Sequence, residues 1–237
     1  MLRNNLNMFL YIIPVILFSL GFHEFSHAYV SYRLGDPTAR NMGRITLNPL
    51  KHLDPLGSLM LLISSYYGSG FGWAKPVPIN PVYYRDRKKG TILVSLAGPL
   101  SNLLLALISA FFTAYVGRKY NIPNGRIFDA FRYGLVNPVN LDAVIFNLFR
   151  VSFVINIGLA VFNIIPVPPL DGSKILSGLL PGRYYYKMLE YENYLSLGFL
   201  LLIFVFPGVL SAVMSPFIAM ASGIIGYIVS PVISIFI

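Results

Sequence analysis

The sequence LNMFLYIIPVILFSLGFHEFSHAYVSY occupies residues 6–32 and is long and apolar enough to cross a membrane as one helix. Near its far end lie His23 and His27, which are four residues apart and therefore share one face of a helix. Two histidines in this arrangement can bind one Zn²⁺, and Glu24 beside the first can act as general base on a water molecule. The stretch therefore predicts a zinc site that lies within a membrane.

The composition of the chain also indicates a membrane protein. Of its 237 residues, 56% are hydrophobic and only 11% are charged, whereas about a quarter of the residues in a soluble domain are charged. The chain contains no cysteine, which excludes disulfides and thiolate zinc ligands. Histidine, aspartate and glutamate remain as the candidate ligands.

Further apolar segments follow the first. Spanning helices are expected at about 91–116 and 141–165, whereas residues 56–67 are too short to cross and predict a re-entrant or interfacial segment. The tail 194–237 holds either two spans broken near Ser215-Pro216 or one span and a re-entrant piece, a choice that Pro207-Gly208 leaves open. We predict an all-α, polytopic membrane bundle, with a three-helix catalytic core in residues 1–180 and one or two C-terminal helices in residues 181–237.

The net charge of +9 comes from basic residues in short loops, which is typical of topology-setting charge near lipid headgroups rather than of nucleic-acid binding. Twelve of the eighteen Lys and Arg residues lie in 33–90 and 166–193, on one side of the predicted membrane. The positive-inside rule places that side in the cytoplasm and the N-terminus outside. His23 would then lie roughly 15 Å below the cytoplasmic surface. We expect a multi-pass protein of a microbial plasma membrane.

A catalytic zinc ion usually has three protein ligands. The segment Asn163-Ile-Ile-Pro-Val-Pro-Pro-Leu-Asp171-Gly172 leaves the third span on the same side as His23 and His27, and its prolines prevent a helix. An aspartate at membrane depth is costly unless a cation pairs with it, so Asp171 is the candidate third ligand. The alternative is that Asp171 only caps a helix. His52, the one remaining histidine, is interpreted as a loop residue or a hydrogen-bond partner in its turn.

These motifs together resemble the site-2 protease family of intramembrane zinc metalloproteases, in its compact microbial branch. The resemblance extends to Gly43–Pro49, His52–Gly57, Trp73–Pro81 and Ala97–Asn102, and it covers about residues 10–180. It implies one Zn²⁺ per chain, bound by His23, His27 and Asp171, with Glu24 as general acid and base. It also implies a substrate that is itself a membrane protein, cleaved near the cytoplasmic face.

Two asparagines have open roles. Asn102 and Asn163 could orient a substrate backbone or stabilise an oxyanion. They could equally form hydrogen bonds from helix to helix.

The sequence therefore predicts an intramembrane zinc metalloprotease that hydrolyses peptide bonds within or near transmembrane segments. The alternative is a membrane metal transporter or binding protein that uses the same His/Asp site. A transporter would not require Glu24, whereas hydrolysis would, so Glu24→Gln separates the two. The expected partners are a substrate with a transmembrane segment and the lipid bilayer, with no nucleic acid; the sequence does not predict an oligomeric state.

Overall fold

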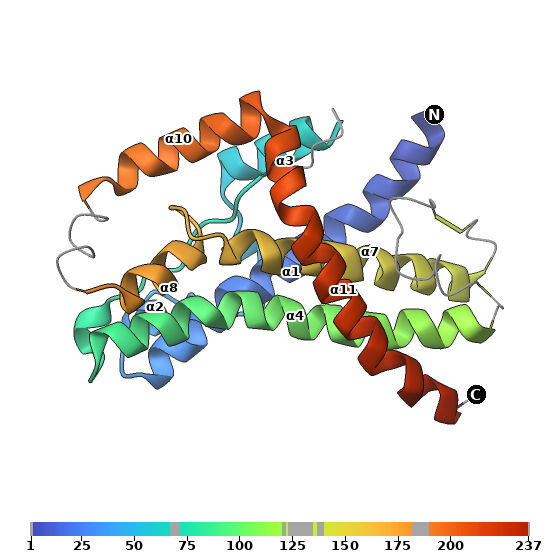
Figure 1. Cartoon of the computed structure of the whole chain (residues 1–237), viewed down its shortest axis with the longest axis horizontal. Coiled ribbons are helices and arrows are strands. Elements are labelled where there is room, and N and C mark those ends of the chain that lie inside the picture. Colours follow the sequence, from blue (N-terminus) through green and yellow to red (C-terminus); the bar gives the residue numbers. More distant parts are fainter. Residues whose placement is uncertain are drawn as a thin grey trace.

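Figure 1 shows the computed structural model of the chain, which describes residues 2–66, 72–119, 122, 135–136, 140–181 and 190–236. Within these ranges the regular elements are helices, and the only β contact is an isolated bridge between Leu53 and Ala74. The elements are α1 (Leu2–Arg33), α2 (Thr38–Asn41), η1 (Pro49–Lys51), α3 (Pro55–Tyr66), η2 (Pro81–Tyr83), α4 (Arg87–Lys119), α7 (Leu141–Ile164), α8 (Asp171–Leu179), α10 (Glu192–Val205) and α11 (Pro207–Phe236). The predicted all-α architecture is confirmed.

Four helices in the described part of the chain are long and apolar enough to cross a membrane. They cover Met8–Arg33, Arg87–Arg118, Leu141–Ile164 and Gly208–Val232. The first three correspond to the spans predicted at 6–32, 91–116 and 141–165. Large apolar side chains on their outer surfaces, such as Leu100, are exposed, which suits contact with lipid tails. The chain is an integral membrane protein.

The third of these helices, α7, shows how local sequence sets the ends of a span. The side chain of Asn140 accepts a hydrogen bond from the backbone N–H of Ala143, and Asp142 lies in the first turn, where a negative charge favours the helix dipole. The helix ends at Ile164, directly before a run that contains three prolines. The chain therefore leaves the helix where the predicted ligand segment begins.

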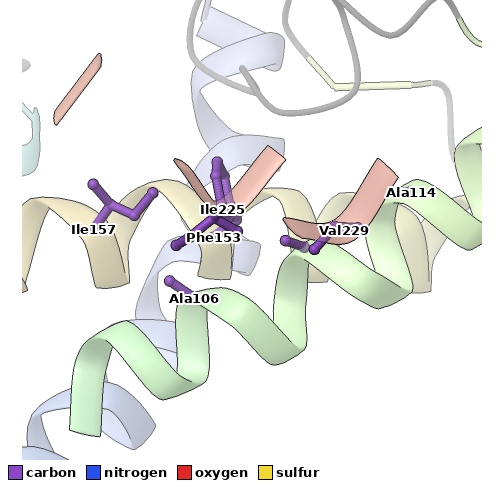
Figure 2. Packing of buried hydrophobic residues seen from close by; sticks show 7 residues of the cluster. Ala106, Ala114, Phe153, Ile157, Ile225 and Val229 are labelled. Carbon is purple, nitrogen blue, oxygen red and sulfur yellow. The ribbon is translucent and has the colours of Figure 1, made fainter. Parts of the chain in front are cut away.

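The long helices α1, α4 and α7 pack together, with α11 lying across α4 and α7 (Figure 1). Figure 2 shows the buried apolar side chains where α4, α7 and α11 meet. This apolar cluster consists of Ala106, Ala110, Ala114, Phe153, Ile157, Ile225 and Val229. The three alanines are spaced four residues apart on one face of α4, and their small side chains let the helix backbones approach closely.

The C-terminal segment corrects one expectation. The tail is interrupted at Phe206, between α10 and α11, and not near Ser215-Pro216, where the two-span alternative placed the break. Pro207 is the first residue of α11, where a missing N–H costs no helical hydrogen bond, whereas Pro216 lies inside the helix. Of the two C-terminal helices, α11 is long enough to span, and α10, with 14 residues, is a shorter apolar helix.

Candidate metal centre

Three buried side chains from two helices converge at one point. His23 and His27 project from adjacent turns of α1, and Asp171 is the first residue of α8. The two Nε2 atoms are 3.0 Å apart, and Asp171 Oδ2 lies 3.2 Å from that of His23 and 3.1 Å from that of His27. Their exposed fractions are 4%, 5% and 7%, so the group is shielded from bulk solvent. We call these three residues the metal centre.

Hydrogen bonds on the far side of each ring decide which nitrogen carries the proton. His27 Nδ1 is 2.7 Å from the carbonyl oxygen of Val94, and His23 Nδ1 is 2.6 Å from Oδ1 of Asn102. Both oxygens can only accept, so each Nδ1 carries the proton and donates. In the neutral rings each Nε2 is left with a lone pair directed into the metal centre.

The donor set fits a zinc ion. Two imidazole lone pairs and a carboxylate oxygen face one another, and Asp171 Oδ2 is buried without a hydrogen-bond partner among the described residues. Such a group is costly unless a cation is bound between its members. Ligand atoms at about 2.0–2.1 Å from a tetrahedral zinc are about 3.3 Å apart, close to the separations observed here.

Gly98 of α4 leaves the space that the two imidazoles occupy. A Cβ atom at this position would lie 2.5 Å from Nε2 of both His23 and His27, closer than any carbon can approach. The backbone of α4 therefore forms one wall of the metal centre. In the sequence, Gly98 is only one residue of the stretch Ala97–Asn102 that resembles the family. Its particular role depends on how α1 and α4 pack, which the sequence pattern does not reveal.

The segment before α8 presents Asp171 through tight backbone packing. A Cβ atom on Gly172 would lie 2.1 Å from the carbonyl oxygen of Ile164, so this turn requires glycine. Leu170 packs with Phe199 and Ile203 of α10. No side chain caps the N-terminus of α8, and the carboxylate of Asp171 faces the histidines. The arrangement differs from that of a helix cap, the alternative interpretation of Asp171.

Glu24 lies beside the metal centre and contacts an extended segment, which we define as residues 72–80. Its Oε2 accepts a hydrogen bond of 2.9 Å from the backbone N–H of Val77. The Val77 side chain is buried against Ala28 and Ala39, which fixes the segment to α1. The half-buried carboxylate of Glu24 is therefore held in place by a backbone group that cannot be identified from the sequence alone.

The carboxylate of Asp36 fixes the other end of the extended segment. It accepts hydrogen bonds from Asn80 N, Ser31 Oγ, Thr38 N and Thr38 Oγ1. Burial favours a raised pKa for Asp36, but these hydrogen bonds outweigh it and hold the pKa below its usual range. Ser31 Oγ also lies 2.7 Å from the hydroxyl of Tyr84, whose pKa is raised by burial. Asp36 thus joins α1 and α2 to the extended segment.

The structure places the remaining candidate residues as follows. Asn102 is fully buried and bonded to His23, which is a helix-to-helix bond, and its suggested contact with substrate stays a prediction. Asn163 is half-buried and donates to the carbonyl oxygen of Leu159, one turn earlier. His52 is buried and its Nε2 donates to the carbonyl oxygen of Thr46, outside the metal centre.

Several known proteins are similar to this chain in sequence. Residues 11–206 match peptidase family M50. The chain is 39% identical over 197 residues to "Putative zinc metalloprotease YwhC" of Bacillus subtilis, covering 83% of this chain and 81% of that protein. It is 33% identical over 167 residues to "Putative zinc metalloprotease Rip2" of Mycolicibacterium smegmatis, covering 70% and 55%. It is 28% identical over 200 residues to the protein of the same name in Mycobacterium tuberculosis H37Rv, covering 84% and 68%. No solved structure matches the chain.

Proposed function

We propose that this chain, which belongs to peptidase family M50, is an intramembrane zinc metalloprotease that hydrolyses peptide bonds within or near transmembrane segments of other membrane proteins. The family match confirms the resemblance to the site-2 proteases that the sequence motifs indicated. The observation that carries the proposal is the convergence of three buried ligand atoms, 3.0–3.2 Å apart, beside Glu24. None of the comparisons favours the metal transporter considered from the sequence.

We assign one zinc ion per chain to His23, His27 and Asp171. When bound, zinc supplies a Lewis acid that lowers the pKa of a water molecule and polarises the scissile carbonyl. The partners of both Nδ1 atoms hold the imidazoles in the tautomer that leaves Nε2 free to bind the metal. Gly98 leaves room for both rings.

Glu24 is proposed as general base and then general acid. Its Oε2 accepts the backbone N–H of Val77, which orients the carboxylate. The other oxygen is then available to take a proton from the attacking water and later to pass that proton to the leaving amine. The extended segment acts here as a support for Glu24, because it is itself held at Asn80 by Asp36.

A helical substrate hides its scissile carbonyl in a backbone hydrogen bond, so it must unwind locally before it is cut. We propose that residues 66–81, of which 67–71 lie outside the described part of the chain, offer an edge to which an unwound substrate adds as a strand. In the extended segment, Arg44 donates to the carbonyl oxygens of Lys75 and Pro76, and Glu24 accepts the N–H of Val77. The N–H groups of Lys75 and Asn80 are bonded to the His52 carbonyl and to the Asp36 carboxylate. Strand addition must use the other backbone groups. The variant Ile79→Pro removes the backbone N–H of residue 79, which strand addition could use. If this variant cleaves the substrate at the wild-type rate, the proposed role of the segment is wrong.

We also propose that the metal centre faces the cytoplasm and that the N-terminus lies outside, because the positive charges predict this orientation. The chain has no cysteine, so single cysteines report position without interference. Cysteines at Arg40 and Lys88 should react with an impermeant reagent from the cytoplasm. A cysteine at position 121, which lies outside the described residues, should react from the other side, and the reverse pattern would invert the orientation.

The decisive experiment combines metal analysis with cleavage of a single-span model substrate in proteoliposomes. Glu24→Gln should retain about one zinc per chain. It should cut at least about a hundredfold more slowly than wild type, because an amide cannot accept the proton. Glu192→Gln, at the start of α10, makes the same chemical change away from the metal centre and should behave as wild type. Cleavage by zinc-loaded Glu24→Gln at the wild-type rate would refute the proposed mechanism.

A further inference from the structure

Asn156 lies at the middle of α7 and is fully buried in a polar layer beside the metal centre. Its Nδ2 donates to the carbonyl oxygen of Ser152 and to Oγ of Ser19, each at 2.9 Å. Its Oδ1 accepts a hydrogen bond of 2.8 Å from Nδ2 of Asn102. Asn102 in turn contacts His23, so the layer connects α7 through α4 to a proposed zinc ligand on α1.

The direction of these hydrogen bonds is fixed from one end. The carbonyl oxygen of Ser152 can only accept, so the amide nitrogen of Asn156 must face it and the amide oxygen must face Asn102. Asn102 must then present its nitrogen to Asn156 and its oxygen to His23. An oxygen at that position requires the proton of His23 to be on Nδ1. The tautomer of His23 therefore follows from the Ser152 carbonyl, two side chains away, while the Ser19 carbonyl, 3.5 Å from Nδ2 of Asn102, favours the same orientation through a longer contact.

We propose that Asn156 is a positioning residue for the metal centre, which acts by orienting the Asn102 amide so that His23 presents an unprotonated Nε2. The proposal rests on the proposed zinc site and extends it to a helix that provides no ligand. Without Asn156, the nitrogen of the Asn102 amide keeps only its 3.5 Å contact with the Ser19 carbonyl, and the amide can rotate to offer that nitrogen to His23. The ring would then favour the tautomer whose Nε2 carries the proton and cannot bind a metal.

A packing role alone does not account for an asparagine at this position. Buried amides cost free energy unless all their groups are paired, and an apolar side chain of similar size would fill the same space without that cost. The other buried asparagine of α7, Asn147, has a different task. Its side chain bonds to the N–H and C=O of Val136, at 3.0 and 2.7 Å. It lies nine residues before Asn156 in the same helix and provides a matched control.

The test measures zinc affinity by competition with a chelator in the purified full chain. Asn156→Leu should bind zinc about tenfold more weakly than wild type, because mutation of outer-shell partners of metal ligands typically costs 10–100-fold in affinity. Asn147→Leu should lose the two side-chain hydrogen bonds to Val136 and keep the wild-type zinc affinity. Equal losses in the two variants would reduce Asn156 to a packing residue. If the wild-type protein binds no zinc, the proposed metal site itself is wrong. A wild-type protein that binds zinc together with an Asn156→Leu variant of unchanged affinity would refute only the role of Asn156.

Two further variants test the route through Asn102. Asn156→Asp keeps an oxygen facing Asn102 in either protonation state, so it should restore zinc affinity to within about threefold of wild type. A packing role predicts the opposite order, because a buried carboxyl group is worse tolerated than leucine. In an Asn102→Ala background, Asn156→Leu should cause no further loss, because residues that act through one another are not additive. Additive losses of zinc affinity in the double variant would overturn the proposal. A tenfold loss of zinc affinity in Asn156→Asp would also overturn it, and this variant alone provides the test if Asn156→Leu does not fold.

Discussion

The two halves of α4 pack against the rest of the protein in different ways. Between Val94 and Asn102 the helix touches the metal centre through a backbone carbonyl, a glycine without space for a Cβ, and a buried amide. Between Ala106 and Ala114 three alanine methyl groups face α7 and α11 in the apolar cluster (Figure 2), and Ser109 adds a hydrogen bond of 2.8 Å to Ser152 of α7. At the first set of positions the contact depends on a particular group or on the absence of a side chain, whereas at the three alanines only size and apolar character matter.

This difference predicts how each half responds to substitution. Substitutions near the metal centre should change zinc binding and catalysis far more than stability. Substitutions in the apolar cluster should change stability far more than zinc binding, because they alter packing without moving a ligand. Four substitutions test the comparison, from the largest expected effect to the smallest.

Gly98→Ala should have the largest effect. The added methyl group would overlap Nε2 of both histidines, so the rings must leave the positions in which they face Asp171. We expect zinc content below detection and cleavage reduced at least about a hundredfold, since misplacement by about 1 Å already costs that much. Metal analysis and cleavage of the model substrate give the measurement.

The matched control for this substitution is Gly158→Ala in α7, where an added Cβ meets no atom within 4 Å. Alanine is favoured over glycine in a helix by up to about 1 kcal/mol, so this variant should be at least as stable as wild type and fully loaded with zinc. If Gly98→Ala retained both zinc and activity, α4 would not form the wall of the metal centre.

Asp171→Asn should have the next largest effect. The amide keeps the size of the side chain but removes the negative charge that balances the metal, while both histidines remain. Mutation of a residue that only supports a metal ligand typically lowers metal affinity by 10–100-fold. Because Asp171 is itself a proposed ligand, we expect zinc affinity to fall by about a hundredfold, the upper end of that range. Asp86→Asn, on the surface before α4, is the control and should bind zinc normally. Normal affinity in Asp171→Asn would leave the zinc with only two protein ligands.

The comparison also shows which features the sequence could predict. The three core helices and the all-α fold follow from apolar runs of sufficient length, and each predicted span agrees with the structure to within about four residues at either end. For the tail, the sequence left open two spans broken near Ser215-Pro216 or one span and a re-entrant piece. In the structure Pro216 is accommodated inside α11, and the chain breaks before Pro207 instead.

The residues of the metal centre could be predicted from the sequence because few residue types can bind zinc. Histidines four apart and an aspartate in a proline-rich exit from a membrane helix are recognisable from spacing alone. Gly98, Asn156 and the N–H of Val77 could not be assigned roles, because each acts only through contacts between distant segments. One signal was present for Asn156: an amide in the middle of an otherwise apolar span is expensive unless it is paired.

Ala110→Leu tests the apolar half of α4. The alanine is completely buried in the apolar cluster, so a larger side chain must push α7 or α11 outward. Overpacking of this kind typically costs about 1–3 kcal/mol of unfolding free energy. Zinc affinity of the folded protein should not change. Unfolding in detergent and chelator competition give the two readings, and a loss of zinc affinity without a loss of stability would contradict the division between the halves.

Asp36→Asn should have the smallest effect and shows how far the sensitivity of the metal-centre side extends. The Asp36 carboxylate accepts hydrogen bonds from both α2 and the extended segment, and its pKa is held below the usual range. A group whose pKa is lower in the folded state stabilises the protein above its ordinary pKa, near 4, and loses that contribution as the pH falls toward the lower folded value. We therefore expect Asp36→Asn to be less stable than wild type by about 1 kcal/mol at pH 7. The difference should shrink below about pH 4, as thermal unfolding across this range would show.

Zinc affinity should stay near the wild-type value, because Asp36 supports Glu24 through the extended segment and does not touch a ligand. A difference in stability that grows as the pH falls would reverse the sign and show that the folded state favours protonated Asp36.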